Sequence, residues 1–446
     1  MQDTTTLATA PQNEEALSPR EQRLERAANI LRWGALISGG VAALVVLVAL
    51  LAAIFDSRAL LDTVSRLLLA RSTGAPDVAL ATVALLSLVN ASLLLVIMVA
   101  VLARELWALP ALVALTVGNG AALALTGYTP ALVPVAAMII AGVILSRDPR
   151  AFRLNPVMLK ELRGRMRGMR AFVVMSVYLG LMSGFTTLLY LVYSSAARAS
   201  SSAAAGEIGR ILFIGIVGIE LLLIVFIAPA FTAGAITGER ERQTYDLLKT
   251  TLLASPSFVI GKLESALGYI LLLLLAAIPL QSIAFLFGGV SETELVLSFV
   301  ILAVAAITLG TVGIYFSAVM QRTLSASVRA YTVTLIATFG IPLAGGVIIS
   351  VIQGAFSGSG NVLPPVIEAA LAYVQLLLTS MNPVATALTT QELLVTRQVI
   401  GFWNQTLSNG STIPMISPWI TYTILYLTAS AVLIVLTIRR TRHTEI

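Results

Sequence analysis

Residues Ile211–Thr251 read ILFIGIVGIELLLIVFIAPAFTAGAITGERERQTYDLLKTT and carry the strongest structural signal in the chain. The apolar run Ile211–Ile236 contains a single charged residue, Glu220. Because about 20 apolar residues cross the hydrocarbon core of a bilayer, this run predicts a transmembrane helix. The dense charges that follow it predict a loop at the membrane surface.

The composition of the whole chain agrees with that interpretation. Of its 446 residues, 58% are hydrophobic and 11% are charged, against about 25% charged in an ordinary globular domain. The mean hydropathy is +0.93. A soluble fold would expose apolar patches that aggregate, and a disordered chain would be far more polar. We therefore predict an all-α polytopic membrane protein.

Apolar runs of suitable length predict about ten transmembrane helices, both ends of the chain lying on one side. The predicted spans are Gly34–Phe55, Val78–Leu102, Leu109–Thr126, Pro130–Ser146, Ala171–Tyr193, Ile211–Ile236, Ala266–Phe287, Leu295–Met320, Tyr331–Ile352 and Trp419–Ile438.

The distribution of basic residues supports this count. With the N-terminus placed in the cytoplasm, 22 of the 28 Lys and Arg residues fall in cytoplasmic segments. Such an excess is what the positive-inside rule requires. Adding or removing one span would invert half of the loops. We therefore expect both termini to be cytoplasmic, in a cell membrane.

The segment Arg147–Arg170 has the densest basic charge, and it separates four predicted spans before it from six after it. The predicted parts are a cytoplasmic tail 1–33, a four-span block 34–146, an amphipathic elbow helix within 147–170, a six-span domain 171–438 and a cytoplasmic tail 439–446. The six-span domain carries a cytoplasmic loop, 237–257, and an extracytoplasmic segment, 353–417. Within that segment, Val366–Met381 is short for a span, so we expect an interfacial or re-entrant helix.

Several kinds of chemistry have no basis in the sequence. The chain has no Cys, and its single His is His443, which excludes Cys/His metal clusters. The pair Gly261-Lys262 is followed by Leu263, so no phosphate-binding loop of the G-x-x-x-x-G-K-[S/T] type is present. Because the chain has no nucleotide-binding or catalytic motif, we expect no enzymatic activity. The basic residues cluster in short loops between apolar runs, where they set orientation, so we expect no nucleic acid as a partner.

Two surface segments carry patterns that suggest function. In Asn155–Arg167, Asn155 is a good N-cap, and Pro156 suits the first helical position. After these two residues, apolar side chains recur on one face of the predicted helix and basic side chains on the neighbouring face. This pattern is typical of a helix that lies in the membrane interface. The alternative is a basic cluster that only fixes topology.

The second segment is the charged loop that follows the sixth span. Tyr245, Leu248 and Leu252 share a helix spacing, which predicts an apolar edge for docking a soluble partner. The alternative is a solvated connection.

A few polar residues interrupt the predicted spans. Glu220 either lines a conduit or subunit interface, or is hydrogen-bonded between helices. Asn90 and Gln281 are polar residues within predicted spans, so we expect each to form a hydrogen bond to a neighbouring helix. Lys262 and Glu264 lie near the start of a span, so we expect them to snorkel toward water.

The order of these motifs resembles the membrane subunit of type-2 ATP-binding cassette (ABC) exporters. The resemblance rests on Asn-Pro-Val with Lys-Glu-Leu-Arg, on Gly-Glu-Arg-Glu-Arg-x-Thr-x-x-Leu-Leu-x-Thr-Thr and on the later Gly-Lys, and it covers about two thirds of the chain, from Arg147 onward. It implies a permease that forms the transmembrane conduit and is driven by a separate cytoplasmic ABC ATPase subunit. ATP and Mg would be bound by that partner. A second permease copy or homologue would complete the complex in a bacterial plasma membrane.

The resemblance also implies roles for particular residues. The elbow helix would contain Asn155, Pro156, Lys160, Glu161, Arg163 and Arg167. The element that couples to the ATPase would contain Glu239, Arg240, Glu241, Arg242, Thr244, Asp246, Leu247 and Leu248. Two departures stand out: Gln243 occupies a position where the family usually has Gly, and four residues separate the paired Thr from Pro256.

Two other functions fit the same sequence. A secondary transporter driven by an ion gradient would need ionisable residues at matching positions of two repeats, and no repeat is evident. A membrane scaffold or assembly factor without transport is compatible with the four additional spans.

Overall fold

The computed structural model describes residues 19–54, 58–71, 76–147, 152, 154–167, 169–197, 203–249, 254–358, 365–408, 410 and 412–443. Residues 1–18 of the predicted tail, 250–253 of the predicted coupling element and 444–446 lie outside the described part.

The described residues contain ten helices long and apolar enough to cross a membrane, which confirms the predicted number and the multi-pass character. They are α1 (Pro19–Ile54), α3 (Pro76–Ala103), α4 (Ala108–Thr126), α5 (Leu132–Ser146), α7 (Met169–Ala197), α8 (Ala203–Ala233), α11 (Ser255–Leu286), α12 (Glu292–Val319), the continuous α13 (Thr323–Leu335) and α14 (Ile341–Gly358), and α17 (Pro418–His443).

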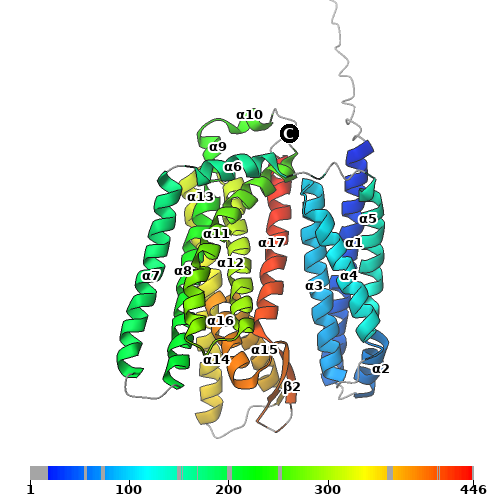
Figure 1. The fold of residues 1–446 in the computed structure, drawn as a ribbon. Helices are drawn as coiled ribbons and strands as arrows, with labels where there is room; N and C mark the ends of the chain where they lie inside the picture. Colours follow the sequence, from blue (N-terminus) through cyan, green and yellow to red (C-terminus); the bar gives the residue numbers. More distant parts are fainter. Residues whose placement is uncertain are drawn as a thin grey trace, which may run out of the picture.

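The long helices run side by side in two groups (Figure 1). One group contains α1, α3, α4 and α5, and α2 (Arg58–Leu68) lies at its lower end in the view. The other group contains the remaining long helices, with α8, α11 and α12 at its core. The short helices α6 (Pro156–Met166), α9 (Thr237–Glu241) and α10 (Tyr245–Lys249) lie across the opposite end, which we call the elbow end.

Helix α1 begins at Pro19, well before the apolar run at Gly34. The predicted cytoplasmic segment 1–33 is therefore helical from Pro19 onward, continuous with the first predicted span. Leu24, Ala27, Ala28 and Leu31 recur at helical spacing, and all four are buried. This apolar stripe extends the helix past the membrane run and packs its charged stretch against the bundle.

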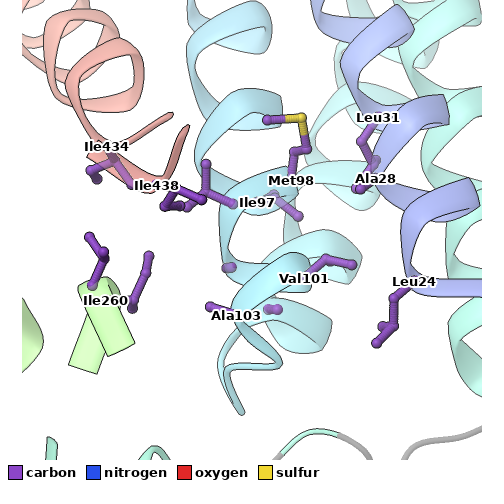
Figure 2. Packing of buried hydrophobic residues seen from close by; sticks show 14 of the residues in the cluster. Leu24, Ala28, Leu31, Ile97, Met98, Val101, Ala103, Ile260, Ile434 and Ile438 are labelled. Carbon is purple, nitrogen blue, oxygen red and sulfur yellow. The ribbon is translucent and has the colours of Figure 1, made fainter. Parts of the chain in front are cut away.

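The two groups meet along α3. In Figure 2, Ile97 of α3 points toward Ile434 and Ile438 of α17, while Met98 lies on the side of α1 near Leu31. These residues belong to one buried cluster that also includes residues of α11 and α12. The four N-terminal spans are therefore packed against the six-span group rather than separate from it.

The segment after α14 contains two helices and a hairpin. The chain bends by 117° between helices α15 (Pro365–Met381) and α16 (Pro383–Arg397), at Asn382, whose side chain caps α16. Strands β1 (Phe402–Thr406) and β2 (Thr412–Ile416) then form an antiparallel pair. The prediction of a short helix at 366–381 is correct, but α16 and the hairpin were not predicted.

Hydrogen bonds place the bend beside the first turns of α17. Tyr426 donates to the Met381 carbonyl at 2.6 Å, and Trp419 donates to the Ile400 carbonyl at 2.8 Å. Met381, at the bend, thus lies deeper along α17 than Ile400, which follows α16. This arrangement favours the re-entrant alternative over a purely interfacial helix.

The ninth span contains a π-helical segment, η3 (Ile336–Gly340), immediately before Pro342. Proline lacks the N–H that an α-helix requires, and a π-turn is one way in which a helix accommodates such a residue. The segment joins α13 to α14 without a chain break.

Candidate functional site

Helix α6 starts at Asn155, as the sequence predicts. The Asn155 side chain accepts a hydrogen bond from the Val157 amide at 3.0 Å, and Pro156 occupies the first turn. The predicted basic face is exposed: Lys160, Arg163 and Arg167 all point away from the protein interior. Leu162, on the apolar face, lies next to Gly268 of α11.

The same asparagine holds three parts of the chain together. Its amide nitrogen donates to Glu105, which follows α3, at 2.8 Å. It also donates to the Ser257 carbonyl of α11 at 2.7 Å. Asn155 is 2% exposed. A residue that the sequence identifies as a simple cap therefore also joins the four-span block to the elbow and to α11.

Gly261 makes this approach possible. A Cβ atom built on Gly261 would lie 2.6 Å from Oδ1 of Asn155, closer than real Cβ contacts allow. Asn155 is fixed by its own hydrogen bonds and cannot easily move away. The glycine of the Gly-Lys pair is thus required by packing between α11 and the elbow.

Lys262 is the centre of the site. Its ammonium group donates to Glu239 of α9 at 2.7 Å and also to Glu161 of α6. The Lys262 side chain is 4% exposed, so the expectation that it snorkels toward water is wrong. A buried ammonium needs compensating carboxylates, and two different segments supply them here. Arg165 lies 4.0 Å from Glu161 and extends the network.

The charged loop is not one helix. Helices α9 and α10 are separated by a turn in which Gln243 has φ of +58°. This left-handed conformation favours glycine, so a residue with a side chain is strained at this position. The Thr244 hydroxyl bonds to the Glu239 carbonyl at 3.2 Å and to its carboxylate, and so fixes the turn.

Most charges of α9 bond to the protein itself. Arg240 donates to the Met320 carbonyl at 2.7 Å, and the Glu241 carboxylate accepts from the Thr323 amide at 2.7 Å. Ser317 of α12 accepts from the Thr237 amide at 3.0 Å. These contacts attach the loop to both ends of the connection between α12 and α13.

Four of the described residues of α9, α10 and the turn between them are exposed: Glu241, Arg242, Gln243 and Leu247, the last of which is 68% exposed. Tyr245 is buried against Phe258, and Leu248 packs on the same cluster, so these two members of the predicted apolar edge face inward. Leu252 and the paired Thr lie outside the described residues, as does the side chain of Asp246.

A second polar cluster lies next to the elbow. Trp107 donates to Glu264 at 3.0 Å, and Glu264 lies close to Glu105. Burial raises the pKa of Glu105 to about 7; the Asn155 hydrogen bond opposes this shift and the neighbouring Glu264 adds to it. Glu105 and Trp107 were not predicted as site residues, because their only signal in the sequence is a short charged interruption between two spans.

Glu220 lies within the bundle, 1% exposed, and accepts a hydrogen bond from Gln281 of α11 at 2.7 Å. The second Glu220 oxygen and the Tyr178 hydroxyl are buried without a hydrogen-bond partner in the described part of the chain. Asn90 and Asn119 exchange hydrogen bonds between α3 and α4. The predicted interhelical bonds of Gln281 and Asn90 are therefore confirmed.

No protein-family model matches the chain, and a search of curated proteins finds no significant relative.

Proposed function

We propose that this chain is the permease subunit of an ABC transporter, an exporter by resemblance, and that a separate cytoplasmic ATPase subunit drives it. The chain itself contributes no catalytic site in this proposal. The observation that carries it is the position of Lys262, which links α6, α9 and α11 through two carboxylates. A force applied to the charged loop is thereby passed directly to the elbow and to a membrane helix.

The loop is suited to transmit such a force because it is rigidly attached. Glu239, Arg240 and Glu241 bond to α11, to the Met320 carbonyl and to Thr323. An ATPase pair that closes on ATP would move the loop only if its two states hold the loop differently. The attached helices would then move with it, which would rearrange the conduit.

The contact with the ATPase is assigned to the exposed part of the loop. Leu247 offers an apolar side chain at the surface, and Arg242 and Gln243 are exposed polar residues five and four positions before it in the sequence. Interfaces between proteins commonly combine an apolar centre with a polar rim. We assign Glu239, Arg240 and Glu241 to holding the loop, not to touching the partner.

In this proposal the elbow end faces the cytoplasm, which the excess of basic residues in the predicted cytoplasmic segments supports. The membrane would be a bacterial plasma membrane. Both termini would then be cytoplasmic. The complex would contain a second copy of this chain or a homologue, since a conduit of this type forms between two six-span domains. Glu220 remains a candidate for the conduit or for the subunit interface.

The test is to isolate the full-length protein in mild detergent and identify what co-purifies. The expected partner carries nucleotide-binding motifs and hydrolyses ATP in the complex. Leu247→Asp and Arg242→Glu should reduce the amount of bound ATPase at least about tenfold, since loss of a central anchor costs about 2 kcal/mol or more and each 1.4 kcal/mol is about tenfold. Leu247→Met is the matched control and should retain binding.

The alternatives predict other outcomes. Cargo uptake by proteoliposomes that contain this chain alone, driven by an ion gradient, would indicate a secondary transporter and contradict the proposal. A co-purifying ATPase whose binding is unaffected by Leu247→Asp and Arg242→Glu would contradict the assigned contact. A stable complex without any ATP turnover would support a scaffold.

A further inference from the structure

A crevice opens at the elbow end between the two groups of helices. Its volume is about 540 Å³, within the range of small-ligand sites. Helix α3 lies between α1 and α17, as Figure 2 shows, and residues of all three helices line the crevice. The crevice is separate from the Lys262 network, so it is independent of the function proposed above.

One wall is polar and basic. Gln22, Glu25, Arg26, Asn29 and Arg32 recur at helical spacing on one face of α1 and line the crevice. Arg439 of α17 faces the same space. The crevice thus contains three arginines and a single glutamate.

These arginines are available to a ligand. Arg26, Arg32 and Arg439 are exposed, and they form no ion pair among the described residues. Arg104 and Arg165, in contrast, are already paired with glutamates. A guanidinium group binds phosphate oxygens through two parallel hydrogen bonds, so three unpaired arginines around one crevice favour an anionic phosphate group.

The remaining lining is apolar. Met98, Val99 and Leu102 of α3 and Val435 and Ile438 of α17 lie next to the arginines. A site for a soluble phosphate would have no use for this surface, whereas a lipid needs both a basic place for its headgroup and an apolar place for its acyl chains. Basic pockets between transmembrane helices at the cytoplasmic side are suited to anionic lipid headgroups.

We propose that the crevice between α1, α3 and α17 binds one anionic phospholipid. Arg26, Arg32 and Arg439 hold its phosphate, and the α3 and α17 side chains contact the first part of its acyl chains. The lipid fills the junction between the four-span block and the six-span group. Binding of such a lipid stabilises the arrangement of the two groups, because it contacts both.

The experiment uses the full-length protein in detergent and native mass spectrometry with added dioleoyl phosphatidylglycerol. The expected result is one lipid retained more tightly than the rest, with dioleoyl phosphatidylcholine retained at least about tenfold less well. The triple variant Arg26→Gln, Arg32→Gln, Arg439→Gln should lose the tight phosphatidylglycerol site. The matched control replaces three exposed arginines at the same end, Arg163, Arg167 and Arg322, and should keep it.

A second variant distinguishes binding in the crevice from nonspecific electrostatic attraction of an anionic lipid to the arginines. Val435→Trp leaves every arginine in place and fills the apolar part of the crevice, so it should also abolish tight binding. Equal retention of phosphatidylglycerol by the wild type and the triple variant would overturn the proposal. Full displacement of the lipid by inorganic phosphate would overturn it as well, because it would indicate a soluble anion site.

Discussion

Lys262 Nζ lies 2.7 Å from Glu239 Oε1 and thereby closes the charged loop, since Glu239 lies at its start in α9 and Lys262 lies just beyond its end in α11. Glu161 binds the same ammonium group from the elbow helix. One buried cation thus joins α6, α9 and α11, so the stability of the elbow end should depend on it.

Replacing Lys262 with Met should loosen the elbow end. The change removes the cation but keeps the side-chain length, so Glu161 and Glu239 lose their shared partner. Breaking a fully buried pair costs about 3–5 kcal/mol, and since both glutamates are partly hydrated we expect about 2 kcal/mol. The apparent unfolding midpoint in detergent should fall, whereas Lys160→Met, on the exposed face of α6, should leave it unchanged.

A double-mutant cycle isolates the contact. Lys262→Met combined with Glu239→Gln should destabilise less than the sum of the single changes, because the second change removes the carboxylate that the first leaves unpaired. Strict additivity of the two effects would contradict a direct interaction.

Gly261→Ala should destabilise the protein, because its new Cβ would lie 2.6 Å from the fixed Asn155 side chain. Overpacking of this kind costs about 1–3 kcal/mol. Gly268→Ala is a matched control on the same helix, since its Cβ would meet Leu162 at an ordinary contact distance of 3.4 Å. Thermal unfolding should show a lower midpoint for Gly261→Ala alone, and equal midpoints would disprove the packing argument.

The raised pKa of Glu105 predicts that the free energy of unfolding depends on pH. Burial raises its pKa from 4.5 to about 7, so the folded state binds a proton more tightly than the unfolded state. The stabilisation is complete below pH 4.5 and is lost as the pH rises through about 7. The loss is at most about 3 kcal/mol, since one pKa unit corresponds to about 1.4 kcal/mol.

Glu105→Gln should flatten this dependence. The amide resembles the protonated carboxyl and does not titrate, so midpoints measured at pH 5.5 and at pH 8 should differ less than in the wild type. The acidic neighbour Glu264 is retained in both proteins. Glu392→Gln, at an exposed position of α16, serves as the control and should keep the wild-type profile. An unchanged profile in Glu105→Gln would show that this carboxyl does not control stability.

The two interpretations of Glu220 can be separated by substitution. Gln281→Leu removes the hydrogen-bond donor of a buried carboxyl and should destabilise the bundle by about 1–3 kcal/mol. Glu220→Gln preserves shape and hydrogen-bonding capacity and should retain the fold. Loss of transport in a stable Glu220→Gln protein would identify the carboxyl as part of the conduit. Normal transport would indicate that Glu220 serves only to hydrogen-bond α8 to α11.

The sequence predicted features that depend on composition and local pattern. Ten apolar runs give ten helices, and Asn155-Pro156 gives a helix start, because both signals are local. The start of α1 was missed because its charged residues obscure the stripe from Leu24 to Leu31. The start of α16 was missed although Asn382-Pro383 carries the same local signal as Asn155-Pro156, an N-cap asparagine followed by proline in the first turn.

The tertiary contacts of the site could not be predicted in the same way. A lysine near the end of an apolar run usually reaches for water. Whether Lys262 does so depends on two glutamates located 101 and 23 residues away. Likewise, the charges of α9 resemble a docking surface in the sequence, and only the fold shows that Arg240 and Glu241 bond to the connection before α13.

The left-handed turn at Gln243 gives the last prediction. A non-glycine residue at φ of +58° is strained by about 1–2 kcal/mol, while glycine in the unfolded chain carries an entropic cost of about 0.5–1 kcal/mol. Gln243→Gly should therefore be neutral or stabilising by up to about 1 kcal/mol. Gln243→Val should be destabilising, because a β-branched side chain fits this conformation poorly. Because Gln243 is exposed and its turn separates α9 from α10, limited proteolysis of the loop should report the difference. Cleavage should be slowest in Gln243→Gly and fastest in Gln243→Val, and the reverse order would show that the turn is not strained.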